Sequence, residues 1–441
     1  MASSSNKRIN KRDLIILSAL LIIGVTGSLI LYAGNNTETE NGLFANVYFM
    51  GEPAFMVDLG SDSAFTLAEV LRLEPYNLPQ VHFEVRDGAM AFVKSDCPDL
   101  LCIFMGPQSQ LGGFAACLPN RLLFHIEKGE HSLYSTAFFD IFDTLIFLRL
   151  FSPSQSEFER YADAIYSELL WLHKLFDIFS EHDGINNIAT INKMAGIRPV
   201  TVDETLIELI SEGIAVYHLS GGAVNIAMGP VLRLWHSFLI GEADSPPNIE
   251  ALEAAKLLSD INDVIIDGNQ VFLAQEGMSL DVGALAKGFA LERAYSVASE
   301  LGVTSGIISI GGDMVIIGSP LDGRETWAVG IENPTGGLFA TKHVVDTSIA
   351  TSGNYQRFVI YGQNRYHHII DPATLMPTTQ FSSITVVHPS PRVAEFLSTA
   401  AFILPFVEGL ELINEFGAEA LWILPDGSYL RSDGFTFAGT D

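Results

Sequence analysis

Several short stretches of this sequence contain residue types that can bind a phosphate group. In Asp281–Gly288, a predicted strand ends and a helix begins at a turn of small residues, which allow a ligand to approach the backbone closely. Lys287 lies in the first turn of that helix, where a positive charge opposes the helix dipole. An anion such as a pyrophosphate at the helix N-terminus would explain this lysine, and an ordinary solvent-exposed lysine is the alternative.

Two other turns contain adjacent glycines, Gly221–Pro230 before an apolar helix and Ile310–Asp313 after a predicted strand. Such turns are more often structural than ligand-binding, so neither one alone indicates a site. They become informative only together with the other motifs of the chain.

Tyr366–Pro372 contains two adjacent histidines, His367 and His368, in a predicted strand. Neighbouring side chains of a strand point to opposite faces, so these two histidines are poor candidates to bind one metal ion together. One of them can face a pocket as a base or as a phosphate contact. A partly buried histidine with ordinary hydrogen bonds is the alternative.

Glu395, Ser398 and Thr399 are spaced i, i+3 and i+4, which on a helix places one carboxylate and two hydroxyl groups on the same face. Oxygen ligands of this kind suit Mg²⁺ beside a phosphate. A helix surface without a metal is the alternative interpretation of the spacing.

The elements that must position these residues follow from the pattern of apolar residues. Spacings of three and four predict helices, and short β-rich segments between them predict strands, so the region after about residue 139 is expected to be α/β or α+β. The predicted helices are Glu157–Phe179, Asp203–Leu219 and Ala284–Leu301, and the predicted strands include Thr144–Leu150, Gly306–Ile310, Trp327–Ile331 and Ser383–Val387.

The N-terminal part begins with a basic tip, residues 1–13, followed by Leu14–Gly34, a run of 21 residues without charge. About 20 apolar residues span a bilayer as a helix. The run is longer than the apolar part of a usual signal peptide, and no small-residue cleavage site follows it. We therefore predict an uncleaved transmembrane anchor with its N-terminus in the cytoplasm, because basic residues stay on that side.

Residues 44–128 are predicted to form a small antiparallel β-barrel or sandwich, because short alternating stretches are separated by turn residues. The three cysteines of the chain, Cys97, Cys102 and Cys117, all lie in this region, so at most one disulfide can form. A disulfide, a redox site and inert buried thiols all remain open from the sequence.

The net charge of the chain is −28, although its N-terminal tip is basic. So acidic a protein repels the phosphate backbone of nucleic acids, and nucleic-acid binding is not expected. Only the tip is suited to an anionic membrane surface.

The order of these motifs along the chain resembles that of the ApbE-like FAD:protein FMN transferase family. The resemblance covers about residues 139–436, and residues 44–128 are similar to the second domain of NusG-like proteins through Ser95–Cys102 and Cys117–Arg121. The motifs that carry the ApbE resemblance are Phe142–Thr144, Phe179-Ser180, Ile191-Asn192, Ser220–Pro230 with Trp235, Asp281–Gly288, Gly311–Asp313, Ala350–Tyr355, His367–Pro372 and Glu395–Thr399.

The resemblance implies an α+β fold, T-fold-like with mixed sheets and packed helices, in residues 137–441. A small β-barrel-like domain at residues 44–128 and the transmembrane helix at residues 14–34 would precede it. The catalytic domain would then lie outside the cytoplasm, on a single-pass protein of the cell membrane.

The resemblance also implies a reaction and a site. Members of this family bind FAD with Mg²⁺ and transfer FMN to a Thr, sometimes a Ser, hydroxyl of an acceptor flavoprotein, releasing AMP. His368, Lys287 and Glu395 would act in catalysis. FAD contacts would fall at Phe142, His182, Ala223, Val224, Asn225, Asp281, Lys287 and the backbone of Ile370, and the metal site would comprise the carbonyl of Ala284 with Glu395, Ser398 and Thr399.

Three residues depart from the common pattern of that family. Many members have Asp where Glu395 and Asn225 stand, and an aromatic residue is common where His182 stands. One alternative is an FAD pyrophosphatase that forms FMN and AMP, with water replacing the acceptor hydroxyl. The other, which Glu395 and Asn225 motivate, is a flavin-binding membrane protein with impaired catalysis. The expected partner is an acceptor flavoprotein of a membrane or extracytoplasmic redox system.

Overall fold

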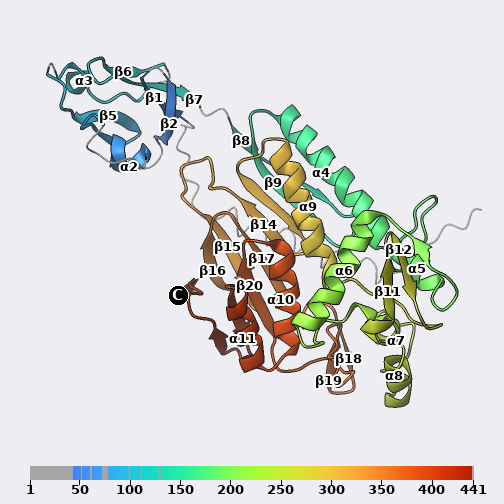
Figure 1. Cartoon of the computed structure of the whole chain (residues 1–441). Helices are drawn as coiled ribbons and strands as arrows, with labels where there is room; N and C mark the ends of the chain where they lie inside the picture. Colours follow the sequence, from blue (N-terminus) through green and yellow to red (C-terminus); the bar gives the residue numbers. More distant parts are fainter. Residues whose placement is uncertain are drawn as a thin grey trace, which may run out of the picture. The chain divides into compact units, whose positions relative to one another are not determined.

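The computed structural model describes residues 43–50, 52–59, 62–71, 78–98, 100–110, 112–128 and 131–439 (Figure 1). Contacts divide the chain into two units, Met1–Gly129 and Glu130–Asp441. The predicted basic tip and anchor, residues 1–34, lie outside the described residues. Among the residues that are described, no helix is both long and apolar enough to span a bilayer.

The first unit consists of two antiparallel sheets around one apolar core, so its described strands form a sandwich and not a single closed barrel. The rings of Phe83, Phe92 and Phe124 meet in this core, with centroids 5.1 Å and 5.3 Å apart. One sheet has the order β2 (Glu52–Asp58), β1 (Leu43–Phe49), β7 (Leu122–Lys128), β6 (Phe114–Cys117), the other β3 (Ser63–Thr66), β4 (His82–Arg86), β5 (Ala89–Lys94), and the helices are α2 (Leu67–Leu71) and α3 (Leu101–Phe104).

An eight-stranded sheet forms the centre of the second unit, and each neighbouring pair of strands is antiparallel. Its edge strand β8 (Ser132–Phe138) begins before residue 137, the predicted start of the domain, and was not predicted from the sequence. The order across the sheet is β22 (Tyr429–Arg431), β21 (Glu419–Ile423), β20 (Ser383–His388), β17 (Thr347–Gly353), β14 (Asp313–Ile317), β13 (Gly306–Ile310), β9 (Ile146–Ser152), β8 (Ser132–Phe138).

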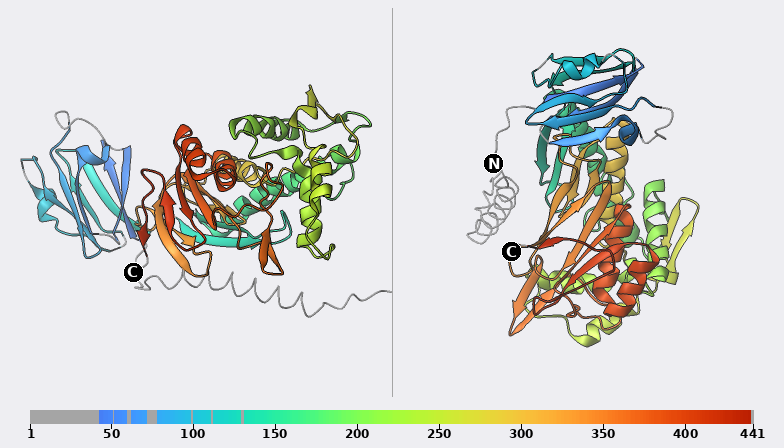
Figure 2. Two further views of the ribbon diagram at one scale, coloured as in Figure 1. Left: turned by 90° about the horizontal axis from the view of Figure 1, so that it is seen from below. Right: turned by 90° about the vertical axis from the view of Figure 1, so that its left-hand side faces the viewer.

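Helices cover one face of this sheet, as the left view of Figure 2 shows. The first of these helices is α4 (Gln155–Phe176). Its apolar residues recur every three or four positions between Phe158 and Phe176, and those at this spacing are buried. Ser154 caps its N-terminus by accepting a hydrogen bond from the Glu157 N–H. The covering helices are α4 (Gln155–Phe176), α9 (Ala286–Glu300) and α10 (Pro391–Ile403), with α11 (Phe406–Glu415) packed on α10.

The opposite face of the sheet is covered by a second, smaller sheet. Trp327 and Phe435 are buried there against Phe151, Ile316 and other residues of the large sheet. The three strands of the small sheet are β15 (Trp327–Glu332), β16 (Leu338–Val344) and β23 (Ala438–Gly439).

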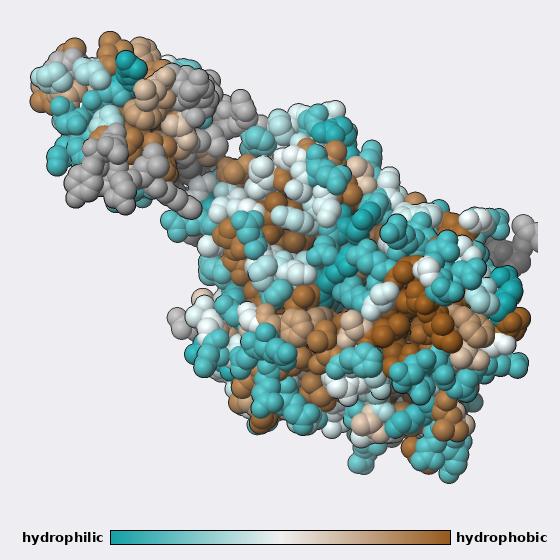
Figure 3. Space-filling view, in the orientation of Figure 1, coloured by the Kyte–Doolittle hydropathy of each residue, from teal (hydrophilic) through white to brown (hydrophobic). Residues whose placement is uncertain are grey.

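The remaining elements extend from the helical layer beside α9. In Figure 3 hydrophobic side chains gather over β11 and β12, where Ile265 is exposed. These elements are α5 (Ile188–Lys193), β10 (Val200–Thr201), α6 (Glu204–Leu219), η2 (Ile226–Met228), α7 (Gly229–Leu239), α8 (Ile249–Lys256), η3 (Ile261–Asp263), β11 (Val264–Asp267), β12 (Gln270–Leu273) and the hairpin β18 (Phe358–Tyr361) with β19 (Asn364–His367).

Candidate active site

The N-terminus of α9 lies directly against α10. A glycine is required at Gly288, because a Cβ there would lie 2.6 Å from the Pro391 carbonyl oxygen and 2.9 Å from Glu395 Oε2. The first N–H groups of a helix have no partner within the helix. Here the Gly288 N–H donates to Glu395 Oε2. In the structure the carboxylate of Glu395 meets the N-terminus of α9, where the sequence had suggested a ligand anion such as a pyrophosphate.

The other carboxylate oxygen of Glu395 is available to a ligand. Oε1 is buried and, among the described residues, has no hydrogen-bond partner, although it lies 3.6 Å from Lys287 Nζ. Burial raises the pKa of Glu395 to about 7; the positive charge of Lys287 opposes this rise, and the negative charge of Asp313 adds to it. An unsatisfied buried oxygen is unusual in proteins and fits a site that gains a cation.

Asp313, which we had not predicted as a site residue, completes the group. Its Oδ2 pairs with Lys287 Nζ, and its Oδ1 accepts a hydrogen bond of 2.8 Å from the Thr351 N–H. Burial alone would lower the pKa of Lys287, but the charges of Asp313 and Glu395 raise it. The signal in the sequence was the Gly-Gly pair before Asp313, where both glycines have positive φ and turn the chain into β14.

The charges of this cluster bear on whether Mg²⁺ fits. Two carboxylates and one ammonium group leave an excess of negative charge when all three are ionised, which favours a divalent cation. Ser398 adds a hydroxyl oxygen, whose proton is donated to the Glu395 carbonyl at 2.9 Å, while Ser352 Oγ lies 2.9 Å away. The donor set therefore fits a hard cation.

The two other expected metal ligands lie close by in the chain. Thr399 is half-buried, one helical turn after Glu395 on α10. Ala284 lies in the turn that leads into α9, three residues before Lys287.

The two histidines have different surroundings, and only His367 lies in a strand, because β19 ends there and His368 follows in a bend. His367 is buried, its Nε2 donates to the Thr378 carbonyl at 2.6 Å, and its Nδ1 accepts from the Ile369 N–H at 3.2 Å. Both ring nitrogens are thus occupied, which indicates a structural role. His368 is open to solvent, and its Nδ1 lies 3.4 Å from the Arg357 carbonyl oxygen.

Desolvation, followed by the positive charge of Arg357 and weaker effects of His367 and Lys287, lowers the pKa of His368 to about 4. The imidazole is therefore neutral at pH 7, with a nitrogen able to accept a proton.

Arg357 was missed from the sequence, because it lies just beyond the quoted Ala350–Tyr355 motif. Its guanidinium Nη2 lies 3.4 Å from the carbonyl oxygen of Asp143, next to Phe142. The positive charge of Arg357 contributes to the lowered pKa of His368 and partly opposes the rise in the pKa of Lys287. The Arg357 side chain therefore lies near both groups. An exposed arginine in this position is suited to a phosphate contact.

Phe142 and His182 lie on two sides of one imidazole. The ring centroid of His173 is 5.5 Å from that of Phe142 and 6.4 Å from that of His182. His182 Nε2 also contacts Asp177 Oδ2 at 3.0 Å, which fixes the ring. The structure thus brings these two predicted flavin contacts into one aromatic group.

The turn at Ala223–Asn225 adjoins the strand end at Asp281. The Asp281 N–H donates to the Ile226 carbonyl at 2.8 Å, which ties the two stretches together. Asn225 uses both ends of its amide, because Oδ1 accepts from the Ala227 N–H at 2.8 Å and Nδ2 donates to the Ser259 carbonyl at 2.9 Å. Ala223 and Val224 are buried beside it.

Asp281 is the carboxylate of this part of the site. Burial raises its pKa, while the hydrogen bond from the Gly283 N–H to Oδ1 at 2.9 Å and the charge of His236 lower it less strongly. A carboxyl group that is desolvated here can interact with a polar ligand edge.

Ile370 is buried in an apolar cluster with Met228, Trp235 and Leu375. Trp235 Nε1 donates to the Leu375 carbonyl at 2.9 Å. Through this cluster the histidine stretch packs against α7, which follows the glycine turn at Ala223–Asn225. The predicted FAD contacts and the predicted metal ligands therefore lie in one connected region of the second unit.

Comparison with known proteins finds a matching family model for each unit of the chain. The sequence model described as the ApbE family matches residues 142–422, and that of NusG domain II matches residues 14–130. An FAD:protein FMN transferase of Treponema pallidum is 35% identical over 267 residues, covering 56% of this chain and 73% of the relative. One of Klebsiella pneumoniae is 28% identical over 271 residues, covering 60% and 83%.

Among solved structures, an ApbE protein of Thermotoga maritima matches with a TM-score of 0.63 and 28% identity, over 68% of this chain and 97% of that one. A flavinyl transferase ApbE of Pseudomonas stutzeri, 23% identical with a TM-score of 0.61 over 69% and 95%, shares the fold. With more than half of its length matched by the family model, the chain belongs to the ApbE family.

Proposed function

We propose that this chain is an FAD:protein FMN transferase that moves FMN from FAD to a Thr or Ser hydroxyl of an acceptor flavoprotein. The observation that carries the proposal is the cluster of Lys287, Asp313 and Glu395 at the N-terminus of α9, with Arg357 and His368 nearby. Acidic and basic groups gathered in this way suit a phosphoryl transfer that needs a divalent cation.

The reaction transfers one phosphoryl group, that of the FMN half of FAD, to the acceptor. The hydroxyl oxygen of the acceptor forms a bond to the phosphorus of the FMN half, and the bond from that phosphorus to the bridging oxygen breaks. AMP leaves with the bridging oxygen and its electron pair, and the hydroxyl proton passes to a base. Because the reaction exchanges one P–O bond for another, the protein contributes mainly positioning and charge stabilisation.

His368 is our candidate for the base. Its pKa of about 4 keeps the ring neutral, and Nδ1–H facing the Arg357 carbonyl would leave Nε2 as the proton acceptor. Lys287 and Arg357 would contact the phosphates.

Mg²⁺ would neutralise the charge that develops on the phosphate oxygens. The residues that would hold it are Glu395, Ser398, Thr399 and the carbonyl of Ala284. The unsatisfied Glu395 Oε1 supports this assignment.

The flavin and adenine groups of FAD would lie along the two surfaces that meet at this cluster. One surface carries Phe142 and His182, and the other the turn at Ala223–Asn225 with Asp281 and the backbone of Ile370. An aromatic group suits a flavin ring, since stacked rings bury large apolar areas.

We further propose that residues 14–34 anchor the protein in the cell membrane and that the acceptor belongs to a membrane or extracytoplasmic redox system. The uncharged run of 21 residues after a basic tip supports this orientation. If the full chain leaves the membrane fraction in an alkaline carbonate wash, or resists protease added outside intact spheroplasts, this placement is wrong.

The reaction is tested with the full chain, FAD, Mg²⁺ and candidate acceptor domains that carry a Thr. We expect a flavin-fluorescent acceptor band and AMP in equal amount. If FMN appears only free in solution, the chain is an FAD pyrophosphatase. If FAD binds and no AMP forms with any divalent metal, it is a flavin-binding protein.

A further inference from the structure

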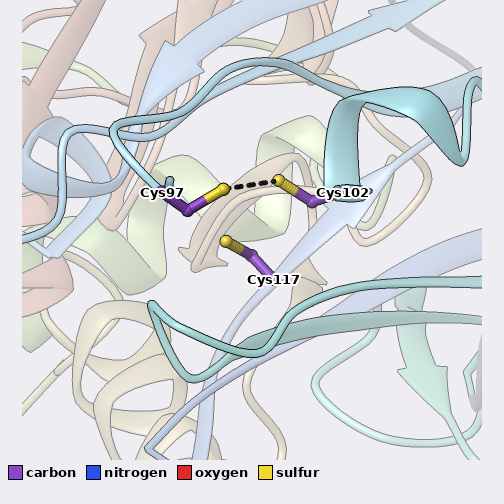
Figure 4. Close-up of side chains that lie close together, drawn as sticks. All are labelled: Cys97, Cys102 and Cys117. Atoms are coloured by element: carbon purple, nitrogen blue, oxygen red, sulfur yellow. Dashed lines mark hydrogen bonds between the residues drawn. The ribbon is translucent and has the colours of Figure 1, made fainter. Parts of the chain in front are cut away.

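The three cysteines of the chain come together in the core of the first unit. Cys97 follows β5, Cys102 lies in α3 and Cys117 ends β6, and all three are buried. Their sulfur atoms all lie within 4.8 Å of one another, as Figure 4 shows. The loop after β5, helix α3 and the end of β6 thus bring every thiol of a chain of 441 residues to one point.

The spacing of the sulfur atoms suits a shared ion. Cys97 Sγ and Cys102 Sγ are 3.6 Å apart. With Zn–S bonds of about 2.3 Å, two sulfurs of a tetrahedral zinc site are about 3.8 Å apart. A disulfide would need the same two atoms at about 2.05 Å, and it would leave the third thiol over. The side chains therefore need to move less for a zinc ion than for a disulfide.

A polar group beside the sulfurs is a second, independent observation. Ser95 Oγ accepts hydrogen bonds from the Cys97 N–H at 3.2 Å and from Asn120 Nδ2 at 3.1 Å. Both lone pairs of this oxygen are then used, so its single proton is directed at the group of three sulfurs, of which Cys117 Sγ is 3.6 Å away.

The orientation of Ser95 is itself fixed by its neighbours. Asn120 Nδ2 also donates to Asp96 Oδ1 at 2.8 Å, and Asp96 Oδ2 accepts from the Gln80 N–H at 3.0 Å. Inert buried thiols need no such oriented donor. Hydrogen bonds to ligand sulfurs are typical of the surroundings of thiolate metal sites.

We propose that Cys97, Cys102 and Cys117 bind one Zn²⁺ ion as three thiolates. Three S–H bonds break, three Zn–S bonds form, the protons pass to solvent, and the ion gives up all but one of its waters. The remaining water completes the tetrahedron, and the Ser95 O–H stabilises the thiolates beside it. Thiolate ligands select Zn²⁺ over hard cations such as Mg²⁺, so this site is chemically distinct from the cluster at Glu395.

The test measures metal in the full chain, purified in detergent under reducing conditions and incubated with Zn²⁺ before desalting. We expect about one zinc per chain by elemental analysis, lost in Cys97→Ser, Cys102→Ser and Cys117→Ser. Met90→Leu is the matched control, since it replaces a buried sulfur of the same core outside the cluster. It should keep the zinc.

Co²⁺ gives a second readout on the same protein. It should produce a thiolate charge-transfer band together with the intense visible bands of tetrahedral coordination. In case the cysteine variants do not fold, Ser95→Ala keeps all three ligands. It should lose zinc to a chromogenic chelator about tenfold or more faster than wild type does.

Three results would overturn the proposal. One is a zinc-free wild-type chain in which three thiols are titrated after denaturation. The second is a Cys97–Cys102 disulfide, found by mass spectrometry, in protein purified without reductant but with zinc present. The third is binding of Cu⁺ with no binding of Zn²⁺.

Discussion

At the residue scale, the contacts of Glu395 explain why this chain has Glu where many members of the family have Asp. The longer side chain reaches the Gly288 N–H with Oε2 and still leaves Oε1 beside Lys287. An Asp on this backbone would be shorter by about one C–C bond, about 1.5 Å, and would lose the helix N-terminus. The length of the Glu395 side chain, which raised doubt about catalysis in the sequence, therefore fits the position of α9.

The first prediction follows from this fit. Glu395→Asp should lower FMN transfer by about tenfold or more, because Mg²⁺ needs near-ideal ligand positions. Glu395→Gln, which keeps the contact with Gly288 but not the charge, should raise the Mg²⁺ concentration needed for half-maximal transfer. Glu415→Gln on the exposed face of α11 is the control. Wild-type activity in Glu395→Asp would show that this carboxylate does not set the metal position.

The second prediction concerns pH. The folded-state pKa of Glu395 is raised to about 7, so the protonated form favours folding, and this contribution is lost as pH rises through about 7. Mg²⁺ must displace that proton, so its affinity should rise up to about tenfold per pH unit below the pKa and level off above it. Thermal shifts with and without Mg²⁺ should diverge between about pH 6 and 8. An equal Mg²⁺ shift across that range contradicts the assignment.

The third prediction concerns Arg357. Arg357→Gln should raise the KM for FAD by about tenfold, since a charged hydrogen bond to a phosphate is worth about 1.5 kcal/mol or more. Arg365→Gln in the neighbouring hairpin is the matched control, because that guanidinium lies over the ring of Phe358 at 4.2 Å. Equal KM changes in both variants would place Arg357 outside the FAD site.

At the element scale, the close contact of α9 with α10 positions the cluster. Gly288→Ala should lower the free energy of unfolding by about 1–3 kcal/mol and greatly reduce transfer, because the new Cβ would overlap the Pro391 carbonyl. Gly409→Ala in α11 is the control, since its Cβ would meet Ala401 Cβ at 3.2 Å, a looser contact than that at Gly288. It should lower the free energy of unfolding less than Gly288→Ala does. Chemical denaturation measures both variants, and an unchanged midpoint for Gly288→Ala would contradict the packing argument.

The turn before η2 gives a further prediction. Asn225→Asp should replace the donor to the Ser259 carbonyl by a carboxylate oxygen, at a cost of about 1–3 kcal/mol that shrinks at low pH, where the acid can donate again. Asn186→Asp, at an exposed amide that donates to the Thr201 carbonyl, should cost less. Urea unfolding at two pH values distinguishes these outcomes, and a stabilising Asn225→Asp would refute the role given to Ser259.

Many of the helices and strands could be predicted from the sequence. The predicted helix Asp203–Leu219 became α6, with Asp203 as its cap, and Gly306–Ile310 became β13, because periodicity and caps are local signals. Asp313 was missed, since its partner Lys287 comes from another element 26 residues away, and Arg357 was missed because it lies just beyond the Ala350–Tyr355 motif. β8 was missed because its residues alternate only weakly between half-buried and exposed.

At the scale of the whole molecule, the two units carry two different kinds of site. The second unit gathers carboxylates, a lysine and hydroxyls, which suit Mg²⁺ and phosphate. The first unit gathers thiols, which suit zinc. Because the ligand types differ, loss of zinc from the first unit and loss of Mg²⁺ from the second can be measured separately on one protein.

The central claim is the covalent transfer of FMN, and the mass of the acceptor tests it most directly. An acceptor domain is incubated with the full chain, FAD and Mg²⁺, and its intact mass is measured beside the AMP released. We expect the acceptor to gain one FMN on a Thr or Ser for each AMP, and to gain none with Glu395→Gln at limiting Mg²⁺. An acceptor that never gains mass while AMP accumulates would contradict the claim.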